Sequence, residues 1–357
     1  MSVLLPETIE RVLVTGGAGF IGGAVVRRLL RHTEAQVFNL DKVGYASDLT
    51  SIELLTQLAE RHHLLKLDLC DLAATEAAVR QVDPDLVLHL AAESHVDRSI
   101  DGPLDFLSSN VIGTFSLLQA VRAHWEALPQ ERQSAFRFQH ISTDEVFGSL
   151  GSTGRFSETT PYAPSSPYSA SKAASDHLVN AWHHTYGLPV LLTNCSNNYG
   201  PWQFPEKLIP LVILKALAGE SIPLYGDGAN VRDWLYVEDH VDALLLVAKQ
   251  GQVGRSYCVG GHGERSNLEV VEMICRLLDQ LRPEGAPHAR LIKHVNDRPG
   301  HDQRYAINPM RISSELGWQP SHDFSQGLTA TVRWYLNNLD WCGKVCEKAG
   351  YGGERIG

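Results

Sequence analysis

A tyrosine and a lysine four positions apart, Tyr168 and Lys172, are the first residues in the chain that could do chemistry together. On a helix this spacing places both side chains on one face. A nearby ammonium favours the phenolate and lowers the tyrosine pKa, so Tyr168 could accept the proton of an alcohol. Thr143 ends an apolar run about 25 residues earlier and could hydrogen-bond the same substrate oxygen. These residues predict an alcohol-oxidising site.

Two adjacent carboxylates, Asp144 and Glu145, follow Thr143 and precede the apolar Val146 and Phe147. Neighbouring acids beside apolar residues should have divergent pKa values, because desolvation and a like charge both favour the neutral form of one of them. Adjacent strand residues point to opposite faces. We therefore expect the strand to have ended by Asp144, so that both acids face one pocket. The alternative is the acidic start of a solvated helix.

A glycine-rich loop with Gly16, Gly19 and Gly22 follows a predicted strand and opens a predicted helix. Glycine permits the tight turn and lets backbone N–H groups approach a pyrophosphate at the helix N-terminus. Asp41 closes the second predicted strand 19 positions after Gly22, which is the context expected for dinucleotide binding rather than for an ordinary glycine turn. Asp41 should bind the adenosine ribose hydroxyls and favour NAD over NADP, although the adjacent Lys42 weakens this preference.

Asp68, at the end of the third predicted strand, has two interpretations. It could reach the adenine of the dinucleotide, or it could simply cap the following helix.

The elements that must position these residues alternate along the first half of the chain. The hydrophobic pattern predicts strands at 11–15, 36–41, 63–69, 85–92, 136–141 and 188–195, and helices at 20–31, 73–81, 104–125 and 168–186. This rhythm predicts an α/β fold with a Rossmann-type doubly wound parallel sheet. In such sheets ligands bind at the carboxyl ends of the strands, where the glycine loop and Thr143 belong.

After residue 197, prolines and glycines interrupt the alternation of predicted strands and helices. We predict an NAD-binding domain over 1–197, with a possible returning segment near 230–262. A smaller, mixed substrate-binding domain is predicted over 198–357, with helices near 207–218 and 239–249.

Composition excludes several classes of protein. The 357 residues carry a formal net charge of −10, which argues against nucleic acid as a partner, and 43% of them are hydrophobic, which argues against disorder. No leader peptide and no membrane-spanning run is apparent. The scattered cysteines fit reduced thiols, and only Cys342 and Cys346 lie close together, at a spacing that suits no usual zinc pattern. We expect a cytoplasmic protein without a metal.

Several motifs resemble the extended short-chain dehydrogenase/reductase superfamily and, within it, the nucleotide-sugar 4,6-dehydratases, most closely those acting on dTDP-glucose. The matching segments are TGGAGFIG (15–22), LDKVGYA (40–46), HLAAESHVDRSI (89–100), STDEVFG (142–148), YSASKA (168–173), NCSNNYGP (194–201), FPEKLIP (204–210), PLYGDG (223–228), RDWLYVEDH (232–240) and DRPGHDQRYAIN (297–308). The resemblance covers most of the chain to about residue 320.

The resemblance implies two sets of binding residues. The NAD side comprises Gly16, Gly19, Phe20, Ile21, Gly22, Asp41, Lys42, Asp68, Leu69, Ala91, Ala92, Ser94, Ser109, Tyr168, Lys172 and Asn198. The substrate side comprises Ser94, Thr143, Asn197, Lys207, Leu208, Pro223, Tyr225, Arg232, Asn267, Arg298, His301 and Tyr305. Arg232 and Arg298 suit a diphosphate through paired donors, and Tyr225 could pack against the base.

The resemblance also implies roles in a reaction. Tyr168 takes the proton of the 4-hydroxyl, Lys172 tunes Tyr168 and holds the nicotinamide ribose, and Thr143 orients the substrate. Once carbon 4 is a ketone, the hydrogen on carbon 5 becomes acidic enough for Glu145 to remove, while Asp144 protonates the departing 6-hydroxyl. The hydride returns to carbon 6, so tightly bound NAD is regenerated in each turnover and dTDP-glucose becomes dTDP-4-keto-6-deoxyglucose.

Other functions stay open from the sequence. The nucleotide could be CDP or GDP instead of dTDP. A nucleotide-sugar 4-epimerase would share the loop, Thr143, Tyr168 and Lys172 but would have no work for the two acids. A catalytically silent NAD and nucleotide-sugar binding protein would usually lose one of these residues. By resemblance, the helices at 104–125 and 168–186 form a four-helix homodimer interface, although they could simply cover the sheet.

Overall fold

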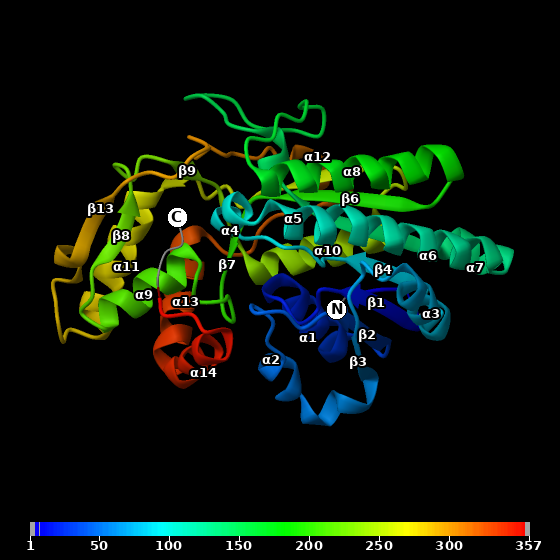
Figure 1. Ribbon diagram of the computed structural model, residues 1–357, viewed down its shortest axis with the longest axis horizontal. Coiled ribbons are helices and arrows are strands. Elements are labelled where there is room, and N and C mark those ends of the chain that lie inside the picture. Colours follow the sequence, from blue (N-terminus) through cyan, green and yellow to red (C-terminus); the bar gives the residue numbers. More distant parts are fainter. Residues whose placement is uncertain (1–3, 7, 354–357) are drawn as a thin grey trace.

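The computed structural model describes residues 4–6 and 8–353, and within this part of the chain seven strands form one parallel sheet (Figure 1). The strands are β1 (Arg11–Thr15), β2 (Gln36–Asp41), β3 (His62–Lys66), β4 (Leu86–His89), β5 (Arg137–Thr143), β6 (Val190–Cys195) and β11 (Ser256–Val259). Their order in the sheet is β11-β6-β5-β4-β1-β2-β3. From β1 the chain adds β2 and β3 on one side, and then β4, β5, β6 and β11 on the other, as in doubly wound dinucleotide-binding sheets. The predicted Rossmann-type fold is confirmed.

Three of the predicted strands are shorter than expected, and one of them, β6, begins at Val190 rather than at 188. β3 ends at Lys66 rather than at 69, and β4 ends at His89 rather than at 92. The apolar pattern continues beyond both ladders because the residues that follow, 67–69 and 90–92, line a cavity instead of pairing with a neighbouring strand. β1 and β2 have their predicted bounds.

Helices cover both faces of this sheet. One face carries α1 (Phe20–His32) and α10 (Val237–Gln250), whose apolar residues share a buried cluster with β1, β2 and β4. The other face carries α3 (Leu72–Val82), α6 (Gly113–Ala127) and α8 (Pro167–Tyr186). Short helices α2 (Thr50–Glu53), α4 (Val96–Asp101), α7 (Gln130–Ala135) and α12 (Met310–Leu316) connect or flank these layers. Burial of both faces explains the continuous apolar character of the strands.

The helix predicted over 104–125 is interrupted. α5 (Pro103–Phe106) leads into a π-helical segment, Leu107–Ile112, before α6 begins. π-Helical turns often occur at functional sites. This segment contributes Ser109 to the wall of the cavity described below.

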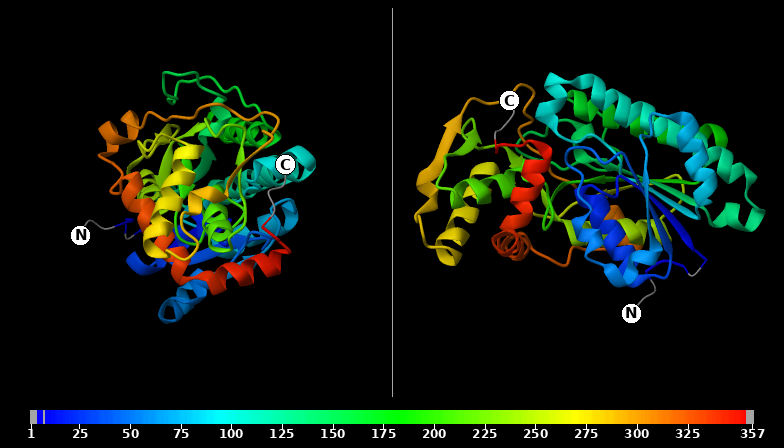
Figure 2. Two further views of the ribbon diagram at one scale, coloured as in Figure 1. Left: turned by 90° about the vertical axis from the view of Figure 1, so that its left-hand side faces the viewer. Right: turned by 60° about the horizontal axis from the view of Figure 1, so that its bottom comes forward.

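A second group of elements lies beside the sheet, and the views in Figure 2 place its strands and helices together at the end of the molecule opposite α6 and α7. It contains β8 (Ile222–Tyr225) paired with β13 (Ile292–Val295), and the helices α9 (Leu208–Leu217), α11 (Asn267–Leu281), α13 (Phe324–Asn337) and α14 (Leu339–Ala349). Short ladders pair β7 (Asn197–Tyr199) with β10 (Trp234–Tyr236) and β9 (Val231–Arg232) with β12 (Arg265–Ser266).

The helices predicted near 207–218 and 239–249 are found as α9 and α10. α9 packs in the second group, whereas α10 and β11 return to the main sheet. The division into domains at residue 198 stays a prediction.

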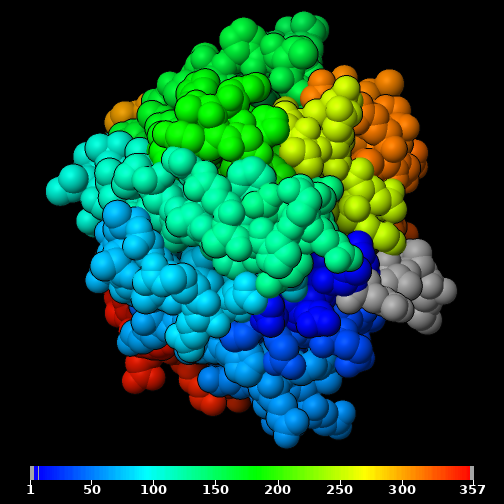
Figure 3. All heavy atoms as spheres, turned by 90° about the vertical axis from the view of Figure 1, so that its right-hand side faces the viewer, coloured from blue at the N-terminus to red at the C-terminus, as the bar shows by residue number. Residues whose placement is uncertain are grey.

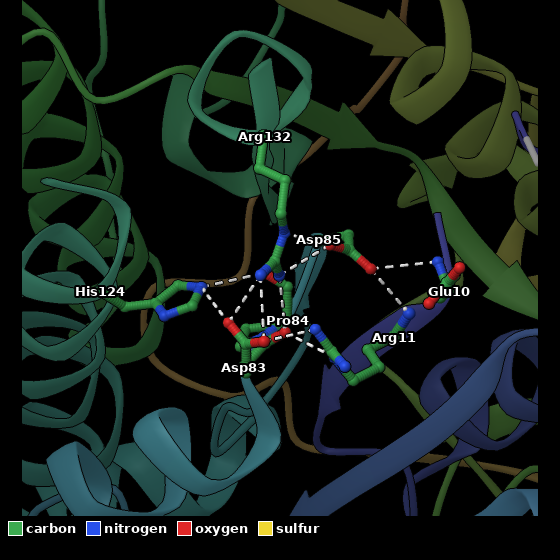
Figure 4. Close-up of polar contacts among 7 residues, drawn as sticks. All are labelled: Glu10, Arg11, Asp83, Pro84, Asp85, His124 and Arg132. Carbon is green, nitrogen blue, oxygen red and sulfur yellow. Dashed lines mark hydrogen bonds and ion pairs between the residues drawn. The ribbon is translucent and has the colours of Figure 1, made fainter. Parts of the chain in front are cut away.

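The amino end of the sheet is closed by paired charges. α3, α6, α7 and the end of α8 surround this side of the molecule (Figure 3). Asp85 accepts hydrogen bonds from the backbone N–H groups of Glu10 (3.0 Å) and Arg11 (2.9 Å), and Arg132 Nη2 donates to its other oxygen at 2.8 Å (Figure 4). Arg11 and Arg132 both pair with Asp83. This network joins the start of β1 to α7 and to the turn before β4.

In the described part of the chain, no helix is both long enough and apolar enough to cross a membrane.

Candidate active site

A cavity of about 350 Å³ opens at the carboxyl ends of the strands, between the sheet and the second group of elements. Its wall includes every residue predicted for the NAD side. These residues are Gly16, Gly19, Phe20, Ile21, Gly22, Asp41, Lys42, Asp68, Leu69, Ala91, Ala92, Ser94, Ser109, Tyr168, Lys172 and Asn198. Thr143, Asp144 and Glu145 line the same cavity, so the structure brings the predicted cofactor and catalytic residues together.

The glycine loop is a close-fitting cradle in which side chains have no room. Gly16 has φ +73°, and a Cβ there would lie 2.7 Å from the backbone of Ala91. A Cβ on Gly22 would lie 2.1 Å from the carbonyl oxygen of Gly16. In the described structure no side chain caps α1 at Gly19, and its first turn carries no acid. An uncapped helix N-terminus behind a glycine loop fits the pyrophosphate of a dinucleotide.

Asp41 lies in the cavity wall beside this loop. Its Oδ2 accepts from the N–H of Ala18 at 3.0 Å, and its Oδ1 accepts from the N–H of Val43 at 2.7 Å and from the hydroxyl of Ser47 at 3.2 Å. A carboxylate offers about four acceptor positions, so one remains for a ribose hydroxyl.

The charge of Lys42 is paired. Its Nζ lies 2.6 Å from Glu93 Oε1. Burial lowers the Lys42 pKa, but the hydrogen bond and charge of Glu93 outweigh this, and the pKa is raised. An ammonium already bound to a carboxylate is less available to a 2′-phosphate, which favours NAD over NADP.

Asp68 does not cap the helix that follows. Asp71 is the N-cap of α3 and accepts from the N–H of Ala74, whereas Asp68 accepts from the N–H of Cys70 at 2.9 Å. The capping interpretation of Asp68 is therefore wrong, and its position in the cavity wall keeps the adenine interpretation available.

The acidic pair lies in a 3₁₀ helix, Asp144–Phe147, that begins immediately after β5. The expectation that the strand has ended by Asp144 is confirmed. Thr143 Oγ1 accepts from the N–H of Glu145 at 3.2 Å and donates to Asp144 Oδ1 at 3.4 Å. Asp144 is only 1% exposed, so the alternative of a solvated helix start is wrong.

The two carboxyls have different surroundings. Burial, followed by the charges of Glu145 and Asp233, raises the pKa of Asp144 well above its ordinary value, and Asp144 Oδ2 has no hydrogen-bond partner among the described residues. Burial also raises the pKa of Glu145, but three cations oppose this effect, namely Arg298, Arg232 and Lys207. The surroundings therefore favour a proton on Asp144 more than on Glu145.

Tyr168 and Lys172 lie in the first turns of α8, which starts with a capping box at Ser166 and a proline at 167. Lys172 Nζ donates to the carbonyl of Ile141 at 2.9 Å. Burial and the charge of Glu145 raise the pKa of Tyr168 well above its ordinary value. The expected lowering of this pKa is wrong for the structure, because desolvation of the phenol and the charge of Glu145 outweigh the hydrogen bond with Thr143, which lowers it.

The residues predicted for the substrate side divide into two groups. Ser94, Thr143, Asn197 and Lys207 line the cavity with the cofactor residues. The remaining residues lie outside this wall and are Leu208, Pro223, Tyr225, Arg232, Asn267, Arg298, His301 and Tyr305.

Several of these outer residues are linked to one another or act on the acidic pair. Arg298 Nε lies 3.4 Å from Asp97 Oδ1, and the Tyr225 hydroxyl donates to Asp97 Oδ2 at 3.2 Å. The Arg232 guanidinium stacks over Tyr305 at 4.3 Å. The charges of both arginines oppose the rise in the pKa of Glu145.

Two residues that position this site were missed from the sequence. Asn110, in the π-helical segment, accepts from the N–H of Glu93 at 2.8 Å and donates to the hydroxyl of Ser171 at 2.8 Å. Glu206 accepts from the Tyr45 hydroxyl at 2.9 Å while lying in the cavity wall. Glu206 belongs to the FPEKLIP motif, which could have drawn attention to it, whereas no sequence signal distinguishes Asn110.

The loop that carries Ser47 and Asp48 is held from outside by α14. Trp341 Nε1 donates to Asp48 Oδ2 at 3.0 Å, and Lys348 Nζ donates to the carbonyl of Ser47 at 3.2 Å. Ser47 lines the cavity. The final helix therefore supports one wall of the predicted cofactor site.

Among the described residues, no group of three or more His, Cys, Asp and Glu side chains is arranged to hold a metal ion.

Comparisons with known proteins show the family of the chain. The family model described as GDP-mannose 4,6 dehydratase matches residues 13–331. The chain is 58% identical to a curated dTDP-glucose 4,6-dehydratase of Xanthomonas campestris pv. campestris (strain B100), over 97% of this chain and 98% of that protein. The chain belongs to the nucleotide-sugar 4,6-dehydratases of the extended short-chain dehydrogenase/reductase superfamily.

Solved structures extend the comparison. A dTDP-glucose 4,6-dehydratase from Streptomyces venezuelae, crystallised with NAD bound, has a TM-score of 0.85 and 42% identity, over 94% of this chain and 99% of that chain. A UDP-glucose 4-epimerase of Thermus thermophilus in complex with NAD has a TM-score of 0.79 and 29% identity, over 91% and 99% of the two chains. The fold is thus common to both activities, and residues within the site must distinguish them.

Proposed function

We propose that the chain is an NAD-dependent hydro-lyase that converts dTDP-glucose to dTDP-4-keto-6-deoxyglucose and water. The observation that carries this proposal is the unequal acid pair: Asp144, buried among acids, and Glu145, facing cations, lie in one cavity with Thr143, Tyr168 and Lys172. An epimerase would need the last three residues but not the acids. The 58% identity to a dTDP-glucose 4,6-dehydratase supports the choice of substrate.

The glycine loop and the ends of β2, β3 and β4 would hold NAD, with Asp41 at the adenosine ribose. NAD, when bound, accepts a hydride from carbon 4 and returns it to carbon 6, so that it is regenerated. The remaining chemistry belongs to side chains of the chain.

Tyr168 accepts the proton of the 4-hydroxyl, and Thr143 hydrogen-bonds the same oxygen. Because burial raises the pKa of Tyr168, its phenolate is a strong base once it forms. Lys172, buried four positions further along α8, would provide the positive charge that supports this phenolate and would hold the nicotinamide ribose.

Elimination follows at carbons 5 and 6. The new ketone at carbon 4 makes the hydrogen on carbon 5 acidic, and Glu145 removes it as a proton. The electron pair forms the double bond between carbons 5 and 6 as the bond from carbon 6 to its hydroxyl breaks. Asp144 donates its proton to that hydroxyl, which leaves as water. Glu145, which now carries a proton that exchanges with solvent, protonates carbon 5 when the hydride returns to carbon 6. The divergent environments of the two carboxyls suit these opposite tasks.

Arg232 and Arg298 would bind the diphosphate of the substrate through paired donors, and Tyr225 would pack against the base. The neighbouring residues Lys207 and Asn197 would bind the sugar nucleotide from the cavity wall.

Incubation with dTDP-glucose in deuterated water tests this function. We expect a 4-keto-6-deoxy product that carries deuterium at carbon 5, without net formation of NADH. Recovery of dTDP-galactose would instead identify an epimerase. Parallel incubations with CDP-, UDP- and GDP-glucose test the nucleotide, and faster turnover of any of these would contradict the choice of dTDP.

We also propose a homodimer formed through the helical surface of α5, the π-helical segment and α6, together with α8. Leu104 is 71% exposed, Leu107 48% and Ile112 50%, and Tyr186 at the end of α8 is 39% exposed. A second copy of the chain would cover these apolar side chains. A cytoplasmic location stays a prediction.

Light scattering after gel filtration tests the dimer. Ile112→Lys should yield monomers, whereas Met310→Lys, which changes another exposed apolar side chain, on α12, should not. A monomeric wild type would contradict the proposal.

A further inference from the structure

A fully buried carboxylate, Asp176, lies behind the proposed catalytic residues. It sits in α8 and receives hydrogen bonds from three other segments. His140 Nε2 lies 3.1 Å from Oδ1, and Oδ2 accepts from Ser142 Oγ at 2.9 Å, the Tyr162 hydroxyl at 2.8 Å and Asn194 Nδ2 at 3.2 Å. A buried carboxylate with this many donors is held in its ionised form. Its pKa is lowered, because burial, which raises it, is outweighed by His140, by a nearby lysine and by Ser142.

The charge of Lys172 acts on this carboxylate, although no ion pair of 4.0 Å or less joins the two in the described structure. The two residues are four positions apart in α8 and so share one helix face. Two other titratable groups face Asp176, and burial disfavours the charged form of each: burial and the charge of Lys172 lower the pKa of His140 to about 4, and burial and Asp176 itself raise the pKa of Tyr162. Within the described structure, Lys172 is therefore the cation that balances Asp176.

The groups that face Lys172 also indicate that its charge and that of Asp176 act on each other. Burial lowers the Lys172 pKa, and Asp176 and then Cys195 oppose this. Burial raises the pKa of Cys195 to about 12, so its thiol is neutral, and burial lowers the pKa of His89 well below its ordinary value. The ionised partner of Lys172 is Asp176.

The same carboxylate holds the end of β5. His140 and Ser142 both bind Asp176, and the carbonyl of Ile141 between them accepts from Lys172 at 2.9 Å. Asn194, which donates to Asp176, also donates to the carbonyl of Thr143 at 3.1 Å. The strand end that carries Thr143 and the acidic turn is thus tied to α8 through one anion.

We propose that Asp176 is a positioning residue, whose buried charge keeps the Lys172 ammonium protonated and whose hydrogen bonds fix the strand end that presents the catalytic turn. This inference rests on the proposed function for the role of Lys172. An unbalanced ammonium in the protein interior would release its proton, and Tyr168 would then lose the charge that supports its phenolate.

Asp176→Asn tests the charge, because it keeps the size and an acceptor oxygen. We expect the alkaline limb of the kcat–pH profile for dTDP-glucose, where Lys172 loses its proton, to move to lower pH by about 1 to 3 units. The rate of NADH formation in a single turnover should fall over the same pH range. An alkaline limb at the wild-type position would overturn the proposal.

Tyr162→Phe is the matched control. It removes one hydrogen bond from the same carboxylate oxygen but leaves the charge of Asp176 in place. We expect its alkaline limb to coincide with that of the wild type. A shift as large as that of Asp176→Asn would show that the hydrogen bonds, and not the charge, set the limb.

A double-mutant cycle of thermal stability with Lys172→Met and Asp176→Asn tests whether the two charges interact, and it does not require an activity measurement. Removing one member of a buried pair leaves the other uncompensated, whereas removing both does not. The double variant should therefore have a higher Tm than either single variant, and it should be recoverable even if a single variant does not fold. Additive losses would overturn the pairing, and this result stands even if the wild type fails to dehydrate dTDP-glucose.

Discussion

The two ends of the sheet contain the same kinds of charged residue in opposite arrangements. At the amino end, Asp83 and Asp85 are partly exposed and paired with Arg11 and Arg132 (Figure 4). At the carboxyl end, Asp144 is buried, has an oxygen without a partner in the described structure and lies beside other acids. The paired charges at the amino end favour stability, whereas the carboxyl end maintains an unfavourable charge arrangement that the proposed reaction would require. Substitutions at the two ends should therefore have different consequences.

The largest effect should come from Glu145→Gln at the carboxyl end. The amide cannot remove the hydrogen on carbon 5, so product formation should fall by about 10²- to 10⁴-fold. Oxidation at carbon 4 does not need this carboxylate, so NADH absorbance should still appear when dTDP-glucose is added. Unchanged product formation would remove Glu145 from its role.

Asp144→Asn, at the same end, should change activity and stability differently. Loss of the acid should lower product formation by about 10²- to 10⁴-fold. Because the folded protein raises the Asp144 pKa, the wild type loses stability as pH rises from the unfolded pKa through the folded one. Asn cannot ionise, so the Tm of the variant relative to the wild type should increase between about pH 5 and about pH 8. A constant difference in Tm would contradict the raised pKa.

At the amino end, Asp85→Ala should reduce stability and leave catalysis alone. It leaves the backbone N–H groups of Glu10 and Arg11 without their acceptor, at a cost of about 1 to 3 kcal/mol in the free energy of unfolding. Denaturant unfolding measures the loss, and kcat/KM should match that of the wild type. A fall in kcat/KM that accompanies an intact fold would show that the two ends are coupled.

The smallest effect should come from Arg132→Ala. This side chain is 32% exposed, so its pairs with Asp83 and Asp85 should contribute about 0.2 to 1 kcal/mol each. Salt should reduce the difference from the wild type, because exposed charges are screened. A loss that is independent of salt would indicate that packing, rather than charge, explains the contribution of Arg132.

The sequence was most informative where a feature depends on neighbours along the chain. β1, β2, the glycine loop and the turn at Asp144 follow from local patterns, and the predicted cofactor residues assemble because each follows a strand of one parallel sheet. β3 and β4 were extended too far because apolar residues that line a cavity resemble those that pair in a ladder. The pKa of Tyr168 was predicted in the wrong direction because the spacing to Lys172 says nothing about burial.

Features that depend on distant segments could not be predicted. The carboxylate of Asp176 has partners from β5, β6 and the loop before α8, and no local pattern identifies this meeting point. Asn110 acts from a π-helical segment whose residues do not differ from those of an ordinary helix. The substrate side also comes from separate loops and strands, so its positions rested on the resemblance alone.

The contact between Trp341 and Asp48 joins residues 293 positions apart. The ribosome makes the glycine loop and six strands of the sheet long before it makes α14. During synthesis, the loop at 45–48 therefore lacks the support that Trp341 and Lys348 later supply. A nascent chain can fold its sheet early, but the wall of the dinucleotide cavity reaches its final form only after α14 has emerged and docked.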